Sequence, residues 1–196
     1  MIDLLSLHKQ FILTHVKEGD ICADFTMGNG YDTEFLARTV GMSGKVYAFD
    51  IQPAAVESTK KRLAEVGCPE NYTLICDSHH NAAKYIDCKI KGGMFNLGWL
   101  PGAEHGVMTL TETTLQAANA ALDILREDGL MTICIYPGHE EGERELNALM
   151  RWASGLDSVR YDVLLKTYLN QPNDPPQMIA VRKKKTKKSK ISDCNT

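Results

Sequence analysis

Two glycines and a carboxylate near the start of the chain have the spacing of a nucleoside-binding site. Gly28 and Gly30 follow an apolar run and precede a segment with helical character, so they should form the turn between a strand and a helix. Glycine lets a ligand approach the backbone, and the helix offers free N–H groups. Asp50 lies twenty residues after Gly30, where a carboxylate can bind both hydroxyls of a ribose. We therefore predict a nucleoside cofactor over the ends of the first two strands.

The same turn argues against a dinucleotide. A dinucleotide fingerprint needs three glycines in the pattern GxGxxG, and the third position here is Thr33. S-adenosylmethionine binds to the same architecture, but its amino-acid end carries a carboxylate and an ammonium and no phosphate. Asp24, at the end of the first expected strand, is the candidate partner of that ammonium. The alternative is a tight turn without a ligand, and the spacing of Asp50 makes it the weaker interpretation.

The elements that must position these residues alternate between strand and helix. Apolar residues at helical spacing predict a leading helix, and short apolar runs bounded by turn residues predict strands. The expected strands cover residues 21–25, 45–50, 72–76, 93–97, 130–136, 158–169 and 177–182. The expected helices cover residues 4–16, 32–40, 53–66, 81–85, 110–126 and 140–152.

The last two expected strands have no helix between them. A parallel neighbour needs a crossover, whereas antiparallel strands can be joined by a hairpin. We therefore predict an α/β fold with a seven-stranded, mostly parallel sheet in the order 3-2-1-4-5-7-6, the last strand antiparallel and helices on both faces. This is the Rossmann-like fold of class I methyltransferases. A dinucleotide domain has a six-stranded parallel sheet instead, so the pattern favours S-adenosylmethionine over a nicotinamide cofactor.

The composition indicates one globular domain followed by a basic segment. The chain has 196 residues, 43% of them hydrophobic, and a net charge of −3. Residues 182–190 hold seven basic side chains and no acid, which leaves the rest of the chain acidic. We expect a domain over residues 1–182 and a basic, disordered tail over residues 183–196. That tail either binds RNA phosphates or is only solvated.

Cysteine usage and hydropathy indicate a cytoplasmic protein without a metal. The six cysteines form no CxxC pair and several lie in apolar runs, so we expect reduced thiols and no zinc site. No apolar run approaches the ~20 residues of a membrane helix, and the N-terminus lacks the form of a secretory signal. Adjacent His79 and His80 should not share an ion. We expect His8 and His15 to be surface residues of the leading helix.

Four blocks of residues resemble one bacterial family of class I methyltransferases, labelled "putative rRNA methylase". The blocks are Asp32-Thr33 and residues 49–52, 95–102 and 136–142. Members of this family are assigned to the last methylation of 5-methylaminomethyl-2-thiouridine at the wobble position of tRNA. The resemblance covers about residues 1–182, and the last two blocks are the specific ones. The family often differs at Phe25, Met27 and Tyr31, which bears on the fit of the pocket, and the lysine-rich tail is not part of its pattern.

The resemblance implies a reaction and a cofactor. The methyl group of S-adenosylmethionine would pass to the amine of 5-aminomethyl-(2-thio)uridine in the anticodon stem–loop of tRNA, without a membrane or a metal. A homodimer is left open. The cofactor would span the ends of the first three strands, and the substrate would face the blocks after the fourth and fifth. The candidate cofactor contacts are Asp24, Met27, Gly28, Asn29, Gly30, Asp32, Asp50, Ile51, Gln52, Asp77, Ser78, His79, Asn96 and Leu97.

Methyl transfer to an amine depends on aiming a free lone pair. The sulfonium is already a good leaving group, so in-line positioning supplies most of the acceleration. An alkylamine has a pKa near ~10 in water, so the site must accept its proton or favour the neutral form by desolvation. Asn96 resembles the asparagine of the Asn-Pro-Pro-aromatic motif in amine methyltransferases, which aims the amine. The other catalytic candidates are Tyr136, His139 and His105, and the candidate substrate contacts are Trp99, Pro101 and Gly102.

Each candidate also has a structural alternative. His105 fits an exposed loop, and His139 fits the cap of the helix that begins at Glu140. Asn96 fits a turn, and Trp99 fits the core, although it would also stack on a uracil base. The alternative functions are methylation of rRNA or of a small-molecule amine, a nicotinamide oxidoreductase on a related sheet, and a non-catalytic RNA-binding module. The intact glycine turn argues against the last of these.

Overall fold

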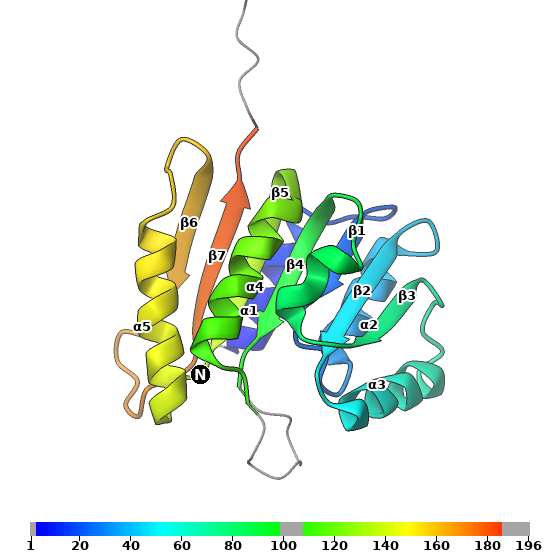
Figure 1. The fold of residues 1–196 in the computed structure, drawn as a ribbon, viewed down its shortest axis with the longest axis horizontal. Helices are drawn as coiled ribbons and strands as arrows, with labels where there is room; N and C mark the ends of the chain where they lie inside the picture. Colours follow the sequence, from blue (N-terminus) through cyan, green and yellow to red (C-terminus); the bar gives the residue numbers. More distant parts are fainter. Residues whose placement is uncertain (1–2, 99–107, 186–196) are drawn as a thin grey trace, which may run out of the picture.

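A seven-stranded sheet between two layers of helices forms the body of the protein (Figure 1). The structure is a computed structural model that describes residues 3–98 and 108–185. The strand order is β3-β2-β1-β4-β5-β7-β6. β7 pairs antiparallel with both β5 and β6, whereas β1 to β5 pair parallel. The predicted order and the predicted antiparallel strand are therefore confirmed.

The elements follow the predicted alternation, with some changes at their ends. The strands are β1 (Ile21–Asp24), β2 (Lys45–Asp50), β3 (Tyr72–Cys76), β4 (Ile90–Asn96), β5 (Leu125–Ile135), β6 (Tyr161–Lys166) and β7 (Gln177–Lys183). The helices are α1 (Leu4–Leu13), α2 (Tyr31–Val40), α3 (Pro53–Glu65), the 3-10 helix η1 (His79–Lys84), α4 (Thr111–Ile124) and α5 (Glu140–Ser154). Within the described ranges, none of these helices has both the length and the apolar character needed to cross a membrane.

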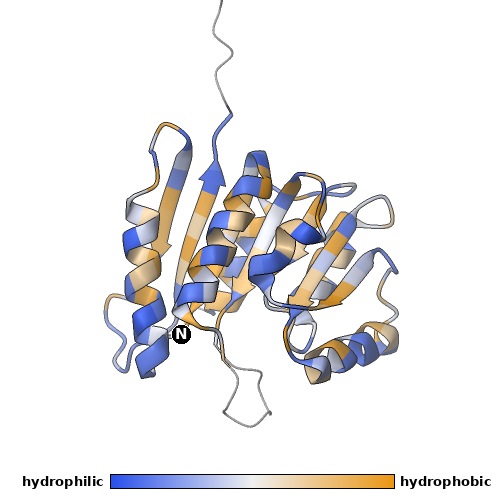
Figure 2. Ribbon diagram, in the orientation of Figure 1, coloured by the Kyte–Doolittle hydropathy of each residue, from blue (hydrophilic) through white to orange (hydrophobic). Residues whose placement is uncertain are grey.

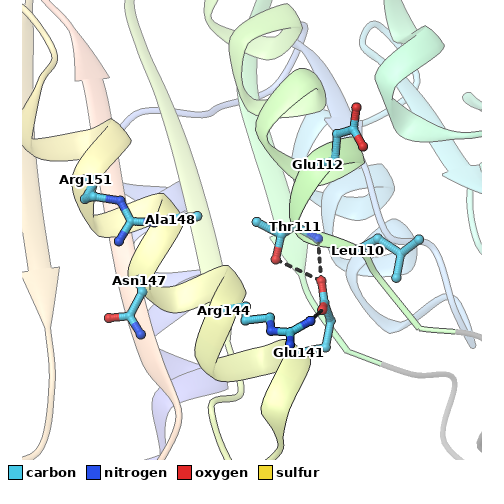
Figure 3. A pocket seen from close by; sticks show the side chains of 8 residues that line it. All are labelled: Leu110, Thr111, Glu112, Glu141, Arg144, Asn147, Ala148 and Arg151. Atoms are coloured by element: carbon cyan, nitrogen blue, oxygen red, sulfur yellow. Dashed lines mark hydrogen bonds and ion pairs between the residues drawn. The ribbon is translucent and has the colours of Figure 1, made fainter.

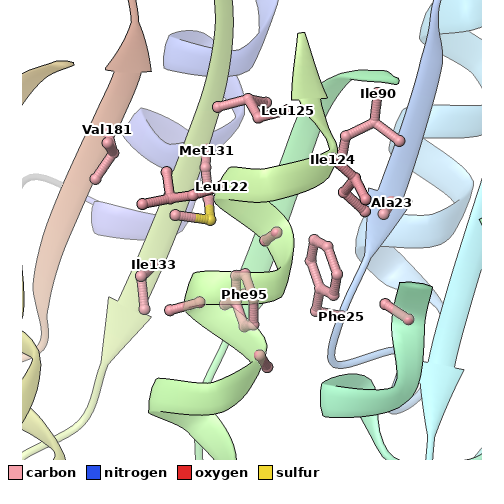
Figure 4. Close-up of a cluster of buried hydrophobic side chains, with 14 of the residues drawn as sticks. Ala23, Phe25, Ile90, Phe95, Leu122, Ile124, Leu125, Met131, Ile133 and Val181 are labelled. Carbon is pink, nitrogen blue, oxygen red and sulfur yellow. The ribbon is translucent and has the colours of Figure 1, made fainter. Parts of the chain in front are cut away.

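Each face of the sheet has its own hydrophobic core. α1, α2 and α3 pack on one face, and η1, α4 and α5 pack on the other (Figure 1). The strands are largely apolar, while the helices carry hydrophilic residues away from the sheet (Figure 2). In the core under η1 and α4, Phe25 stacks on Phe95 with ring centroids 4.3 Å apart (Figure 4). Strand residues alternate between the two cores, as the pleat of a sheet requires.

Gly92 lets the segment after α1 lie directly on β4. A Cβ atom at this position would stand 2.6 Å from Cγ2 of Val16 and 3.1 Å from Sγ of Cys22. A side chain there would push α1 away from the sheet. Because α1 also borders the cavity described below, this close approach sets one wall of the site.

α4 ends earlier than the sequence predicts. We expected the helix to reach residue 126 and to close at Asp128-Gly129, but β5 already begins at Leu125. Lys183 donates to the carbonyl oxygens of Leu122 and Leu125 at 3.0 and 2.8 Å, which satisfies groups at the helix end. Asp128 adopts a left-handed conformation inside β5, where the register to β4 shifts. These contacts come from distant strands, so the local sequence does not contain them.

α1 is also shorter than predicted, and one of its histidines is not on the surface. The helix ends at Leu13, three residues before the expected end. His8 is fully buried, which corrects our prediction of a surface residue. Its Nδ1 lies 3.0 Å from Sγ of Cys134 on β5. Burial lowers the pKa of His8 to about 4. The imidazole is therefore neutral inside the fold at neutral pH.

The buried histidine should make folding sensitive to mild acid. His8 in the unfolded chain titrates near pH 6.5 and in the fold near pH 4, so protons bind preferentially to the unfolded chain between these values. The free energy of unfolding of the wild type therefore falls with pH through this window, by about 2 kcal/mol from pH 7 to pH 5. We expect the difference in unfolding free energy between the wild type and His8→Gln to shrink by this amount, measured by urea denaturation.

The control is Asn119→Ala, which removes an exposed side chain without a titratable group. The difference in unfolding free energy between this variant and the wild type should change little between pH 7 and pH 5. If the His8→Gln difference were equally independent of pH, His8 would not be the neutral buried group that the structure shows.

Candidate active site

A cavity of about 1040 Å³ opens at the carboxyl ends of the parallel strands. Ligands of open α/β sheets bind at this edge, outside the strand ends. It is lined by residues that follow β1 to β5 and by parts of α1 and of the connection before β7. The predicted cofactor contacts that line it are Met27, Gly28, Asn29, Asp32, Asp50, Ile51, Gln52, Ser78, His79, Asn96 and Leu97.

The turn after β1 is held by α3. Gly30 has a φ of +82°, and a Cβ atom there would lie 2.8 Å from Cγ2 of Thr59. The Thr59 hydroxyl donates to the carbonyl oxygen of Gly28 at 2.9 Å. Ser58 donates to the Asn29 side chain at 2.8 Å. Gly30 therefore serves the packing of the turn, whereas Gly28 and Asn29 face the cavity.

Asp50 lines the cavity at the end of β2, as the sequence predicts. It accepts hydrogen bonds from the backbone N–H groups of Gly28 and Gln52, at 3.0 and 2.9 Å. Burial raises the pKa of Asp50, and these two N–H groups oppose the rise. Each carboxylate oxygen keeps a lone pair free to accept from a ligand hydroxyl. The geometry therefore suits a vicinal diol such as a ribose.

Asp77 does not face the cavity, although it follows β3 as predicted. Its oxygens accept from the Ser78 backbone, the Asn81 amide and the Tyr85 hydroxyl, at 2.7, 3.0 and 2.8 Å. These bonds lower the pKa of Asp77. The carboxylate is thus used in fixing the start of η1, and the cavity is lined at this place by Ser78 and His79.

His79 presents a hydrogen-bond acceptor at the same end of the cavity. Its Nδ1 lies 3.0 Å from the carbonyl oxygen of Phe25, which can only accept, so Nδ1 carries the hydrogen and Nε2 is left as an acceptor. Burial lowers the pKa of His79 to about 4, so this arrangement holds at neutral pH. Ile51 lines the same cavity and is exposed, so it adds apolar surface suited to a purine.

Asp24 is enclosed by the protein and does not line the cavity. Only 1% of its surface is exposed, and its carboxylate accepts from the Thr33 hydroxyl at 2.7 Å and from the Thr26 backbone at 3.1 Å. Burial, followed by the neighbouring charge of Asp32, raises the pKa of Asp24. Asp32 lines the cavity and pairs with Lys9 of α1, with Nζ and Oδ1 3.3 Å apart. Asp32, unlike Asp24, is therefore open to a ligand ammonium.

Asn96, Tyr136 and His139 line one side of the cavity, as their positions after β4 and β5 predict. The Asn96 backbone N–H donates to the Thr26 hydroxyl at 2.6 Å, which ties the end of β4 to the turn after β1. No hydrogen bond joins the Asn96 side-chain amide to another of the described residues. Burial raises the pKa of Tyr136 well above its usual range.

His139 caps α5. Its Nδ1 accepts from the Gly142 backbone N–H at 3.0 Å, so the alternative that the sequence left open for this residue is observed. Gly142 has no room for a side chain, because a Cβ atom would lie 2.1 Å from the Tyr136 carbonyl oxygen. α5 therefore starts in close contact with the end of β5. The cap leaves the neutral ring with its hydrogen on Nε2.

Several residues of the cavity were not among the sequence candidates. Lys9 and Leu5 come from α1, and Asp174 and Pro176 come from the connection before β7. Nothing in the local pattern of these segments marks them, because the fold alone brings them to the strand ends. Tyr31 gave a better signal, since it adjoins the glycine turn. The Arg62 guanidinium lies 3.6 Å from the centre of its ring.

Four sequence candidates lie outside the described residues. They are Trp99, Pro101, Gly102 and His105. The two residues that flank this segment are hydrogen-bonded to each other. The Thr109 N–H donates to the carbonyl oxygen of Gly98 at 2.9 Å, and the Gly98 N–H donates to the Thr109 hydroxyl at 3.0 Å. Gly98 and Thr109 both line the cavity.

A second, smaller hollow of about 510 Å³ lies between the start of α4 and α5 (Figure 3). Glu141 accepts there from the backbone and the hydroxyl of Thr111, both at 2.8 Å, and Arg144 pairs with Glu141. These charges satisfy one another. Among the described lining residues, Leu110 is the one that this hollow shares with the large cavity, and the predicted catalytic residues Asn96, Tyr136 and His139 line the large cavity instead.

Comparisons with known proteins agree with this architecture. A family model described as "Putative rRNA methylase" matches residues 46–182. A protein of Arabidopsis thaliana named "tRNA (mnm(5)s(2)U34)-methyltransferase, chloroplastic" is 35% identical over 170 residues, which cover 82% of this chain and 62% of the plant protein. This chain thus corresponds to less than two thirds of that curated relative.

Two solved structures share both the fold and part of the sequence. A "putative rRNA-methylase" of Clostridium thermocellum is 40% identical with a TM-score of 0.91, over 93% of this chain and 98% of that one. A "putative methyltransferase" of Streptococcus mutans, solved in complex with SAH, is 34% identical with a TM-score of 0.84, over 93% of this chain and 99% of that one. SAH is S-adenosylhomocysteine, the demethylated form of S-adenosylmethionine.

The two carboxylates at the ends of β2 and β3 should differ in their effect on ligand binding. We expect Asp50→Ala to weaken binding of S-adenosylhomocysteine by tenfold or more, because charge-assisted hydrogen bonds contribute ~1.5–3 kcal/mol each. Asp77→Ala is the matched control and should change the affinity by less than about threefold, since Asp77 does not line the cavity. Isothermal titration calorimetry measures both. An equal loss in the two variants would contradict this placement of the ligand.

Proposed function

This chain belongs to the "Putative rRNA methylase" family of S-adenosylmethionine-dependent methyltransferases, and we propose that it methylates an amine on the wobble uridine of tRNA. The substrate would be 5-aminomethyl-(2-thio)uridine and the product 5-methylaminomethyl-(2-thio)uridine. The name of the relative from Arabidopsis thaliana contains mnm(5)s(2)U34, which is the product, 5-methylaminomethyl-2-thiouridine, at position 34. The observation in the structure that supports the proposal most is an acidic cavity in which Asn96 keeps its amide available.

The charge of the cavity suits the cofactor. Three carboxylates line it, those of Asp32, Asp50 and Asp174, whereas Lys9 is the only lysine or arginine among the described residues that do. S-adenosylmethionine brings a sulfonium and an ammonium against one carboxylate, so its net positive charge is complementary to this lining. The pyrophosphate of a dinucleotide would meet like charges there, which disfavours the nicotinamide alternative.

The cofactor then has a definite direction along the strand ends. Asp50 would bind the ribose hydroxyls, and His79 Nε2 would accept from the adenine amine. S-adenosylmethionine supplies an activated methyl group when it is bound. Asn96 stands at the end of β4 and would hold the substrate amine on the side of the sulfonium, with its amide oxygen accepting an N–H of the amine. Such a contact aims the lone pair, which is the main need of this reaction.

Neither Tyr136 nor His139 has the properties of a strong base. The raised pKa of Tyr136 keeps the phenol protonated at neutral pH. His139 uses its Nδ1 lone pair in the cap of α5, and Nε2 of the neutral ring already carries hydrogen. Both side chains can therefore donate hydrogen bonds and orient the substrate. We infer that the amine loses its proton to water before transfer and that the site selects the neutral form.

The RNA part of the proposal is supported by the plant relative and by the position of the cavity. Its rim includes Gly98 and Thr109, which flank the segment that carries the predicted substrate contacts. An anticodon stem–loop can present its wobble base to such an edge. Methylation of rRNA, which the family description suggests, is the second candidate. An assay that identifies the RNA that accepts the methyl group distinguishes the two candidates.

Loss of Asn96 should affect turnover and spare cofactor binding. We expect Asn96→Ala to lower the single-turnover rate by roughly 100-fold, the typical cost of misaligning the reacting atoms. Its affinity for S-adenosylhomocysteine should stay within about threefold of the wild type. The assay follows methyl transfer to an anticodon stem–loop that carries 5-aminomethyl-2-thiouridine, by mass spectrometry of the nucleosides. Asn119→Ala, which removes an exposed asparagine bonded to Trp152, is the control.

The outcomes of this assay separate the alternatives. Full turnover by Asn96→Ala would remove the assignment of the amine site. If the wild type methylated rRNA fragments and did not methylate the stem–loop, rRNA would be the substrate and the tRNA proposal would be wrong.

The pH dependence should report the amine and not a protein base. Below the amine pKa of ~10, the neutral fraction rises tenfold per pH unit, so the single-turnover rate should rise about tenfold from pH 6 to pH 7. Tyr136→Phe and His139→Gln should lower the rate without changing this slope, because both side chains act by orientation. A variant whose rate became independent of pH would show that the replaced residue accepts the proton.

A further inference from the structure

Lys9 is a cation in an otherwise acidic cavity, and the proposed reaction leaves it without a role. It lies on α1, which also contributes Leu5 to the cavity, and not at the end of a strand. Its Nζ stands 3.3 Å from Oδ1 of Asp32 and 5.4 Å from the centre of the Phe35 ring. About a third of the side chain, 32%, is exposed. The ammonium is therefore held in place and still reachable from the cavity.

Asp32 provides the second half of this feature. Its side chain is only 9% exposed, and it lies in the first turn of α2, directly after the glycine turn. Asp24, the nearby alternative, is closed off by Thr26 and Thr33. Within the described lining of the cavity, Lys9 and Asp32 form the one pair of fixed opposite charges. Such a pair is complementary to a zwitterion.

We propose that Lys9 and Asp32 together bind the amino-acid end of the cofactor, with Lys9 on its carboxylate and Asp32 on its ammonium. The proposal rests on the proposed function, which directs the ribose toward Asp50 and thereby the amino-acid end toward the start of α2. A carboxylate entering this cavity meets the charges of Asp32, Asp50 and Asp174, so it needs a cation. Lys9 supplies that cation from a helix that none of the sequence motifs includes.

In this arrangement the two charges of the protein alternate with the two charges of the ligand, and each charge has an opposite neighbour. Lys9 keeps Asp32 and gains the ligand carboxylate, while Asp32 keeps Lys9 and gains the ligand ammonium. Each new contact is a charge-assisted hydrogen bond in a partly buried place, where such bonds are stronger than on the surface. The pair therefore selects ligands that carry a complete amino-acid group.

The test compares two ligands that differ only in the carboxylate. Calorimetry gives the affinities of S-adenosylhomocysteine and of its decarboxylated form for the wild type, Lys9→Met and Lys9→Arg. We expect the wild type to prefer S-adenosylhomocysteine by about tenfold to a hundredfold. Lys9→Met should bind both ligands with nearly equal affinity, and Lys9→Arg should keep most of the preference because it keeps the charge.

A surface lysine serves as the matched control. Lys61 lies on α3 and also pairs with an acid, Glu65 at 3.9 Å, but it does not line the cavity. Lys61→Met should therefore behave as the wild type toward both ligands. Thermal unfolding without ligand shows whether each variant is folded before it is titrated.

The results separate this inference from the proposed function. If Lys9→Met kept the wild-type preference for the carboxylate, the role of Lys9 would be wrong while the cofactor assignment would stand. If the wild type bound neither ligand, the cofactor assignment and the inference would fall together. Equal weakening of both ligands by Lys9→Met would also overturn the inference, since it would show an effect on the cavity and not on the carboxylate.

Discussion

The turn between β1 and α2 holds the whole site together. Gly28 donates from its backbone to Asp50 of β2, and the Thr26 hydroxyl accepts the backbone N–H of Asn96 at the end of β4. The Thr59 hydroxyl of α3 donates a hydrogen bond to the Gly28 carbonyl oxygen and so fixes the same turn. The residue proposed for the ribose and the residue proposed for the amine are thus each bonded to one short loop. Their separation is therefore held by direct hydrogen bonds to that loop, at 3.0 Å for Asp50 and 2.6 Å for Asn96.

The order of the strands and the ends at which the site lies could be predicted from the sequence. Alternating apolar runs and the missing crossover before the last strand carry that information locally. The direction of each side chain could not be predicted in the same way. Asp24, Asp50 and Asp77 all follow strands, yet only Asp50 lines the cavity. Local hydrogen-bond donors decide between them, since Thr33 encloses Asp24 and Tyr85 holds Asp77 away.

The contributions of α1 and of the connection before β7 show the same limit over longer distances. Lys9 and Asp174 are 165 positions apart in the sequence and meet at one cavity only because the sheet brings both segments to its edge. The sequence predicts His8 at the surface of the leading helix, whereas the structure buries it fully. The contact with Cys134 depends on how α1 crosses β5, which no local pattern contains.

The position of β7 also has a consequence for how the chain assembles during synthesis. β7 is later in the sequence than β6, but it lies between β5 and β6 in the sheet. Until β7 has been made, β5 has an open edge and β6 has no strand beside it. Val163, Leu164 and Leu165 of β6 are exposed even in the complete sheet, and before β7 is made the backbone of this strand is unpaired as well, a state prone to association with other chains. The sheet can therefore be completed only after β7, the antiparallel strand, has been synthesised.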